Sequence, residues 1–312
     1  MFCNINILSS IIQVRRLFYM FKLRLEKPPF VKPAFRKPRL KKLNFNKRKA
    51  LKYTLSALIL IGATLSFKTA LERIYDAEEV FLTANAEEKK LPIYSVDTEG
   101  KKVALTFNAA WGSDDVDEIL TILEENDVKS TFFFCGYWVD RYPDEVRKIY
   151  TKGHDIANHS DTHPHPNLLS LEKNKEEIMN VHEKVKELLG YEMKFYRPPF
   201  GEYNNTVIQA AEESGYYSVQ WDVDSLDWKK LGVEHEINQV LSNKNLKDGS
   251  IILFHNDAEH TPAALGPIIK GLKEQGYEIV PLSELIHEED YHINNEGRQI
   301  LNSKKEETGL FN

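Results

Sequence analysis

Short apolar runs alternate with amphipathic stretches over most of the chain that follows residue 92. Runs such as Lys102–Phe107 and Ser250–Phe254 are apolar and β-prone, which is typical of strands buried on both faces of a parallel sheet. Between such runs lie stretches like Asp114–Asn126, whose apolar residues recur at helical spacing. Because strands and helices alternate in this way, the pattern predicts successive parallel βαβ units.

The ends of these elements follow from capping and stop signals. Strands are expected at 102–107, 130–135, 154–158, 194–196, 216–221, 250–254 and 277–280. Helices are expected at 114–126, 145–152, 171–189, 204–214, 234–241 and 261–274, followed by a short one capped by Ser283. Ser170 is a good N-cap for the longest helix, and Pro262 suits a first helical turn. The expected fold class is α/β, a distorted (β/α) barrel of about seven strands.

The N-terminal part has a different pattern. Residues 1–49 are predicted to be a basic, Pro-rich cytoplasmic head, and residues 50–69 a transmembrane anchor or signal segment, uncharged from Tyr53 to Phe67. Basic residues precede the apolar run, so the positive-inside rule places the N-terminus in the cytoplasm and the rest outside it. Ala84-Asn85-Ala86 resembles a cleavage site but lies far downstream of the run, which favours a retained single-pass anchor.

Charge divides the chain in the same way. Residues 1–52 contain fifteen Lys or Arg and one acid, whereas the remaining residues contain 26 bases and 46 acids. The basic head predicts binding to an anionic membrane surface; nucleic acid is disfavoured because no aromatic–basic motif accompanies it. The predicted organisation continues with a linker at 70–91, a folded domain at 92–287 and a loose polar tail at 288–312. Oligomeric state is left open.

The two cysteines, Cys3 and Cys135, predict neither a disulfide nor a cysteine metal cluster. Cys135 ends an apolar strand, whereas Cys3 lies in the basic head. We expect two free thiols.

Polar side chains follow five of the predicted strands, where catalytic groups of α/β barrels are found. These polar segments are 108–112, 158–165, 197–201, 222–228 and 255–257. His159 and His163 suit a first-row metal such as zinc, although two unrelated surface histidines give the same pattern.

His255 closes an apolar strand and suits a general acid; a structural histidine at a strand end is the alternative. Asp227 and Arg197 are expected to form a buried pair that tunes this acid, or a purely structural ion pair. Trp228 and Phe200 are expected to form an apolar wall for an acetyl methyl or a sugar face, with core packing as the alternative.

Four ordered motifs together resemble the polysaccharide deacetylase family, also known as NodB-homology domains or carbohydrate esterase family 4, over about residues 92–287. The motifs are His159-Ser-Asp-Thr-His163, Arg197-Pro-Pro-Phe-Gly201, Asp224-Ser-Leu-Asp227-Trp228 and Leu253-Phe-His255-Asn-Asp257. The resemblance implies a divalent metal, with zinc as the expected ion, and hydrolysis of N-acetyl groups from GlcNAc- or MurNAc-containing cell-wall polysaccharide.

That resemblance assigns roles to individual residues. It implies metal ligation by His159 and His163. It implies catalytic roles for His255, Asp227, Arg197 and Asn108. It implies substrate contacts from Phe200, Gly201, Trp228 and Leu253.

The first family motif, Thr-Phe-Asp-Asp-Gly, is altered here to Thr106-Phe-Asn-Ala-Ala-Trp-Gly112. Asn108 stands where the family has its general base, and Ala109 where it has an aspartate metal ligand. The chain resembles in this a sporulation-type branch with an irregular first motif. Asp114 or Asp115 is a hypothetical substitute ligand, and Asp161 or His165 a hypothetical substitute base.

Two further function classes remain open. One is a degenerate deacetylase that binds cell-wall glycan without cleaving it, which the altered first motif favours. The other is a different metal-dependent hydrolase on the same barrel, acting on phosphoesters or ureides. The Arg-Pro-Pro-Phe-Gly and Asp-x-x-Asp-Trp motifs disfavour that second class.

Overall fold

The computed structural model describes residues 88–303 and eight residues between 52 and 69. The chain divides into two units, Met1–Asn85 and Ala86–Asn312. In the first unit the eight described residues are helical and exposed, and the Ser56 hydroxyl donates to the Lys52 carbonyl oxygen over 2.9 Å. No helix among the described residues is long and apolar enough to cross a membrane. The predicted head, Cys3, most of the predicted anchor and most of the linker lie outside the described residues.

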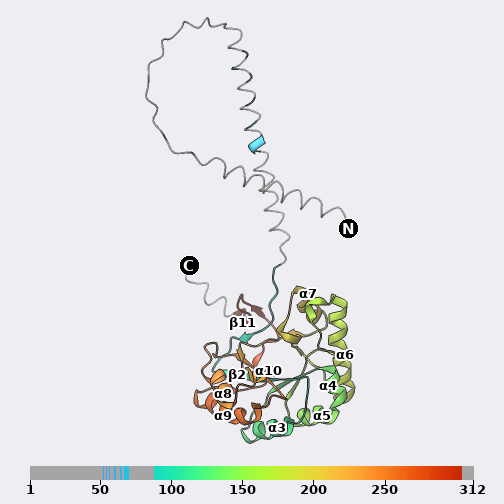
Figure 1. Cartoon of the computed structure of the whole chain (residues 1–312), viewed down its shortest axis with the longest axis vertical. Coiled ribbons are helices and arrows are strands. Elements are labelled where there is room, and N and C mark those ends of the chain that lie inside the picture. The colour runs from blue at the N-terminus through green and yellow to red at the C-terminus, as the bar shows by residue number, and fades with distance from the viewer. Residues whose placement is uncertain are drawn as a thin grey trace, which may run out of the picture. The chain divides into compact units, whose positions relative to one another are not determined.

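The second unit is built on a curled mixed sheet (Figure 1). Its strands are β1 Ser95–Val96, β2 Lys102–Ala109, β3 Thr131–Phe134, β4 Asp155–Asn158, β5 Phe195–Tyr196, β6 Tyr217–Ser218, β7 Val223–Asp224, β8 Ser250–His255, β9 Glu278–Ile279, β10 Tyr291–Ile293 and β11 Arg298–Leu301. The sheet order is β10-β11-β1-β8-β2-β3-β4-β5-β6, with β7 on β8 and β9 on β2.

Helices surround these strands (Figure 1). They are α3 Val116–Glu125, α4 Gly136–Arg141, α5 Pro143–Thr151, α6 Leu171–Leu189, α7 Asn205–Glu213, α8 Val233–Leu241, α9 Thr261–Glu274 and α10 Leu282–Leu285. Three short 3₁₀ turns are η1 Pro166–Leu168, η2 Pro199–Gly201 and η3 Asp227–Lys229. Within residues 88–303 no ladder joins β6 to β7, so the expected α/β fold takes the form of an open, curled sheet.

Strand β2 shows how the two faces of the sheet are used. Val103, Leu105 and Phe107 pack in the core cluster between sheet and helices, whereas Ala104 belongs to the smaller cluster inside the curl. Because side chains alternate along a strand, Asn108 shares the inner face with Ala104. The inner face therefore presents Asn108 at the carboxyl end of the strand.

The predicted parallel strands and long helices are present, and the predicted bounds of α6 and α9 coincide with the observed ones. The Ser170 hydroxyl caps α6 by accepting from Lys173 N–H over 3.3 Å. Ser283 does not cap α10, because that helix begins one residue earlier, after Pro281. Helix α4 was not predicted; its six residues are too few to show a helical period.

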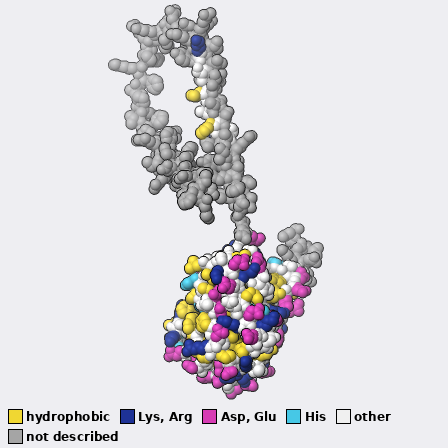
Figure 2. Space-filling view, turned by 90° about the vertical axis from the view of Figure 1, so that its right-hand side faces the viewer, with side chains coloured by type: hydrophobic (Ala, Val, Ile, Leu, Met, Phe, Trp, Pro, Cys, Tyr) yellow, Lys and Arg dark blue, Asp and Glu magenta, His cyan; other side chains and the backbone are white. Residues whose placement is uncertain are grey.

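The expectation of a loose polar tail from residue 288 is wrong for residues 291–301. Strands β10 and β11 pair antiparallel there, and β11 runs parallel to β1. β10 is the edge strand of the sheet and β11 lies between it and β1. Gln299 is the one fully buried residue of these two strands. Figure 2 shows acidic and basic side chains interspersed over one face of this unit.

Candidate active site

An open pocket of about 550 Å³ lies at the carboxyl ends of the parallel strands. Its lining residues are Asn108, Trp111, His159, His163, Phe200, Gly201, Trp221, Asp224, Asp227, Trp228, Lys230, Leu253, His255, Asp257 and Ala258. The structure thus brings every residue of the predicted site to one pocket except Arg197, which lies buried behind Asn108. The pocket edges include the short turns η2 and η3.

His159 and His163 lie side by side, with ring centroids 5.0 Å apart. His159 is 2% exposed, and its Nδ1 lies 2.7 Å from the Arg197 carbonyl oxygen. A carbonyl oxygen only accepts, so Nδ1 carries the proton and Nε2 keeps its lone pair. Burial lowers the pKa of both imidazoles, most strongly that of His159. Two neutral imidazoles with one fixed tautomer are suited to hold a divalent metal.

The loop between these histidines is held by Glu177 of α6. This carboxylate accepts from the Ser160 hydroxyl at 2.6 Å and from the Thr162 hydroxyl and backbone N–H, each at 2.8 Å. Ser160 and His163 adopt positive φ angles of 72° and 54°, a conformation that non-glycine residues keep only when the surroundings enforce it. Glu177 is therefore a positioning residue for the histidine pair.

Asp227 and His255 form a hydrogen-bonded pair. His255 Nδ1 donates to Asp227 Oδ1 over 2.8 Å, and the His255 backbone N–H donates to Oδ2 over 2.6 Å. Asp227 is fully buried, and it also accepts from the Thr261 hydroxyl at 3.1 Å. The carboxylate therefore fixes the imidazole tautomer and orients Nε2 as the free ring nitrogen.

Arg197 is fully buried and contacts Asn108 instead of the expected Asp227. Its guanidinium donates to Asn108 Oδ1 and to Thr106 Oγ1, each at 2.9 Å, and to the Gln220 carbonyl oxygen at 3.1 Å. The predicted Arg197–Asp227 pair is thus wrong, because Asp227 is satisfied by His255. Within residues 88–303 Arg197 forms no ion pair, and burial lowers its pKa to about 9.

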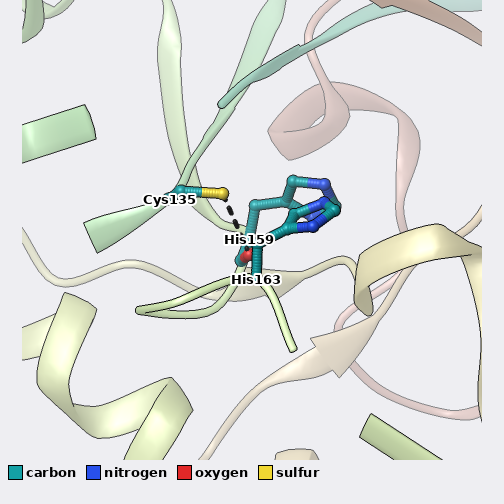
Figure 3. Close-up of side chains that lie close together, drawn as sticks. All are labelled: Cys135, His159 and His163. Atoms are coloured by element: carbon teal, nitrogen blue, oxygen red, sulfur yellow. Dashed lines mark hydrogen bonds between the residues drawn. The ribbon is translucent and has the colours of Figure 1, made fainter. Parts of the chain in front are cut away.

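A third candidate metal ligand lies beside the histidines. Cys135, His159 and His163 each offer one ligand atom, and these atoms lie within 4.8 Å of one another (Figure 3). The hypothesis that Asp114 or Asp115 replaces the missing ligand finds no support, since neither belongs to this cluster or lines the pocket.

Neither hypothetical substitute for the base lines the pocket. Asp161 accepts from Lys184 Nζ at 2.6 Å, which holds the carboxylate against α6. His165 stacks on Phe200 with ring centroids 4.4 Å apart and pairs with Glu202 over 3.0 Å.

Three aromatic side chains form an exposed rim around the pocket. Trp111, Phe200 and Trp228 are 57%, 55% and 54% exposed, respectively. This exposure excludes core packing, the alternative for Phe200 and Trp228. Leu253 and Gly201 also line the pocket, Leu253 with little exposure.

Comparisons with known proteins agree with this geometry. The family model described as polysaccharide deacetylase matches residues 95–219. A peptidoglycan-N-acetylglucosamine deacetylase of Bacillus cereus is 36% identical over 62% of this chain and 92% of its own length. The chain belongs to the polysaccharide deacetylase family. This identification agrees with the four motifs and with their placement around one pocket.

Two other relatives are informative. The uncharacterized protein YlxY of Bacillus subtilis is 33% identical over 63% of this chain, which spans only 61% of that protein. The crystal structure of a CE4 family pseudoenzyme from Bacillus anthracis superposes with a TM-score of 0.60 at 31% identity, covering 63% of this chain and 69% of that one. A mutant of that pseudoenzyme is described as having restored enzymatic activity. The family of this chain therefore contains named peptidoglycan deacetylases as well as a pseudoenzyme.

Proposed function

We propose that this protein is a metal-dependent N-deacetylase of cell-wall glycan that acts slowly because Asn108 replaces the general base. The observation that carries the proposal is one pocket holding a histidine pair, His159 and His163, and an oriented acid, His255 on Asp227. In the ladder between β2 and β8, Asn108 lies directly opposite His255. The proposed general acid, His255, therefore lies next to Asn108, which occupies the position of the general base.

The reaction would replace the bond between acetyl carbon and sugar nitrogen with a bond to a water oxygen. A divalent metal, which we propose to be zinc, supplies Lewis acidity toward the acetyl carbonyl and the water when it is bound by His159 and His163. His255 gives the proton from Nε2 to the departing amine, and the Asp227 carboxylate stabilises the imidazolium before that transfer. Products are acetate and a free amino sugar.

The missing step is removal of a proton from the attacking water. An amide such as that of Asn108 offers no basic site for it. Loss of a general base costs typically 10²–10⁴-fold in rate. The intact acid and histidine pair still favour slow hydrolysis, because simple binding of a glycan needs no general acid.

A second candidate is a glycan-binding protein without catalysis. The contact that favours it is the Arg197–Asn108 hydrogen bond, since an amide satisfies the buried arginine without supplying a base. Similarity to the Bacillus anthracis pseudoenzyme supports the same candidate. The rim of Trp111, Phe200 and Trp228 fits an extended sugar chain in either case.

We further propose that the domain faces an N-acetylated peptidoglycan outside the cytoplasm. The sequence supports this with basic residues preceding an uncharged apolar run. On this proposal the protein is a single-pass membrane protein whose basic head contacts anionic lipids. Protease digestion of intact spheroplasts should then remove the domain but leave the head. Protection of the domain would contradict this topology.

The function is tested by acetate release from N-acetylated peptidoglycan and from chitooligosaccharides, using the full chain in detergent with zinc. A phosphoester and a ureide serve as comparison substrates. His163→Ala and a chelator provide the controls, and circular dichroism checks that each sample is folded. We expect acetate release that both controls abolish. Binding of the glycan with no release of acetate would favour the second candidate, a glycan-binding protein. Cleavage of only the phosphoester or the ureide would contradict both candidate functions.

A further inference from the structure

The segment that leaves β3 packs directly along the histidine loop. The Gly136 backbone N–H donates to the Ser160 carbonyl oxygen at 3.0 Å, and the Tyr137 N–H donates to the Asp161 carbonyl oxygen at 3.2 Å. At Gly136 a Cβ would lie 1.9 Å from Asp161 Oδ1, so only glycine permits this approach. The two backbones are therefore fixed against each other at short range.

Cys135 is the residue that this contact brings to the histidines. It is fully buried, and its Sγ lies 3.4 Å from the His159 carbonyl oxygen, to which the thiol donates. The sulfur and one nitrogen of each histidine lie within 4.8 Å of one another. Figure 3 shows the sulfur on one side of the His159 backbone and the two imidazole rings close together.

Cys135 also adjoins the position where the usual carboxylate ligand is missing. Its backbone N–H donates to the Ala109 carbonyl oxygen at 3.1 Å, and Phe134 pairs with Ala109 across the ladder between β2 and β3. The thiol thus emerges from the strand next to the one that carries the alanine. A methyl group at Ala109 cannot bind a metal, whereas a thiolate is a strong ligand for zinc and cobalt.

We infer that Cys135, His159 and His163 form a three-ligand site for a soft divalent metal such as Zn²⁺, in which a thiolate from β3 replaces the carboxylate lost at Ala109. The inference rests on the proposed function for its catalytic meaning, but the site can be tested without catalysis. His159 and His163 line the pocket whereas Cys135 does not, so the thiolate would bind from the buried side. The fourth position would then open toward the pocket.

Binding requires a small rearrangement and the loss of one proton. In a tetrahedral zinc site the ligand atoms lie roughly 3.3–3.6 Å apart. Ligand atoms that are up to 4.8 Å apart here must therefore approach one another by as much as roughly 1.5 Å. Metal binding would also require the Cys135 thiol to give up its hydrogen bond to the His159 carbonyl oxygen. The thiol proton passes to solvent as the bond between sulfur and metal forms, because a coordinating thiol is deprotonated.

Cobalt spectroscopy tests the site directly, because thiolate binding to Co²⁺ produces a charge-transfer band in the near ultraviolet. The full chain carrying Cys3→Ser leaves Cys135 as its one thiol, so such a band reports on that residue alone. We expect one equivalent of Co²⁺, the charge-transfer band, and visible bands typical of tetrahedral cobalt. Absence of the charge-transfer band from bound cobalt, or failure to bind cobalt, would overturn the inference.

Two variants sharpen the test. Cys135→Ser should abolish the charge-transfer band and weaken metal binding by more than the roughly 10–100-fold that loss of an outer partner of a ligand costs. His163→Ala, in the same Cys3→Ser background, should weaken binding as well. Unchanged affinity in Cys135→Ser would contradict the inference even if a variant of the histidine behaved as expected.

The outcome is separable from that of the proposed function. A thiolate band without acetate release would support the metal site and contradict the proposed deacetylase function. Acetate release by the cobalt-loaded protein without the charge-transfer band would support the deacetylase function and show that Cys135 is not a ligand.

Discussion

Arg197 Nη1 donates to Asn108 Oδ1 over 2.9 Å, so a fully buried guanidinium is held by a neutral amide. Arg197 Nη2 donates to the Thr106 hydroxyl and to the Gln220 carbonyl oxygen, whereas Nε has no hydrogen-bond partner. Burial of an arginine without a carboxylate is costly, as its lowered pKa of about 9 indicates. The site therefore retains Arg197, which suits a carboxylate as its partner, although residue 108 is an asparagine.

Replacing the amide by a carboxylate should stabilise the fold. We expect Asn108→Asp to raise the free energy of unfolding by about 1–3 kcal/mol at neutral pH, because a charge-assisted bond would then compensate Arg197. Urea denaturation followed by fluorescence measures this difference. Asn108→Ala is the matched control and should be destabilised. An Asp variant no more stable than the wild type would show that Arg197 does not act as an uncompensated charge.

Asp227 and His255 should act as one unit. Asp227→Asn removes the negative charge that stabilises the His255 imidazolium, and His255→Gln removes the proton donor itself. Each substitution should lower kcat for acetate release by about 10²–10⁴-fold. The double variant should be scarcely slower than the slower single variant, because both changes remove the same step. Multiplicative losses would indicate that the two residues serve separate functions.

Glu236 of α8 gives a pH-dependent prediction about stability. Burial raises its pKa from 4.5 to about 7, with a further contribution from the Asp227 carboxylate. Between these pH values the folded protein binds more protons at this carboxyl than the unfolded chain does. Its contribution to stability therefore falls as the pH rises through this window, and the full cost remains above pH 7.

The substitution Glu236→Gln should remove that cost. The difference in unfolding free energy between variant and wild type should be small near pH 4 and should grow to on the order of 3 kcal/mol at pH 8. Denaturation curves at several pH values measure it. A difference that stays constant with pH would contradict the assignment of a raised pKa to this group.

The aromatic rim should contribute to glycan binding. Trp228→Ala should raise the Kd for a chitooligosaccharide by about tenfold, since a large exposed aromatic face contributes roughly 1–2 kcal/mol when it is covered. Its stability should hardly change, because the indole is 54% exposed. Isothermal calorimetry measures the Kd. Leu168, which is 82% exposed and does not line the pocket, provides Leu168→Ala as the control that should bind normally.

The alternation of strands and helices could be predicted because buried strands and amphipathic helices have distinct periods. The gathering of polar residues was also predictable, because carboxyl ends of parallel strands share one edge of the sheet. Which of these side chains hydrogen-bond to one another could not be predicted. Sequence order cannot show that Arg197 meets Asn108, or that Asp227 meets His255, since both contacts depend on how the loops fold.

Residues that position others gave no signal in the sequence. Glu177 lies on a helix surface rich in charge, where nothing distinguishes it from its neighbours until the structure places it under the histidine loop. Cys135 was expected to be a free thiol at the end of an apolar strand, because the sequence of that strand does not reveal which loop will pack against its end. Gly136, which allows that packing, is uninformative without Asp161 beside it.

The most direct test of the account compares acetate release from N-acetylated peptidoglycan by the wild type and by Asn108→Asp, each loaded with zinc. The account predicts slow release by the wild type and a rate about 10²–10⁴-fold higher in the variant, abolished when His255→Gln is added. A variant no faster than the wild type, with metal bound and glycan affinity intact, would contradict the claim that the pocket is a deacetylase site lacking only its base.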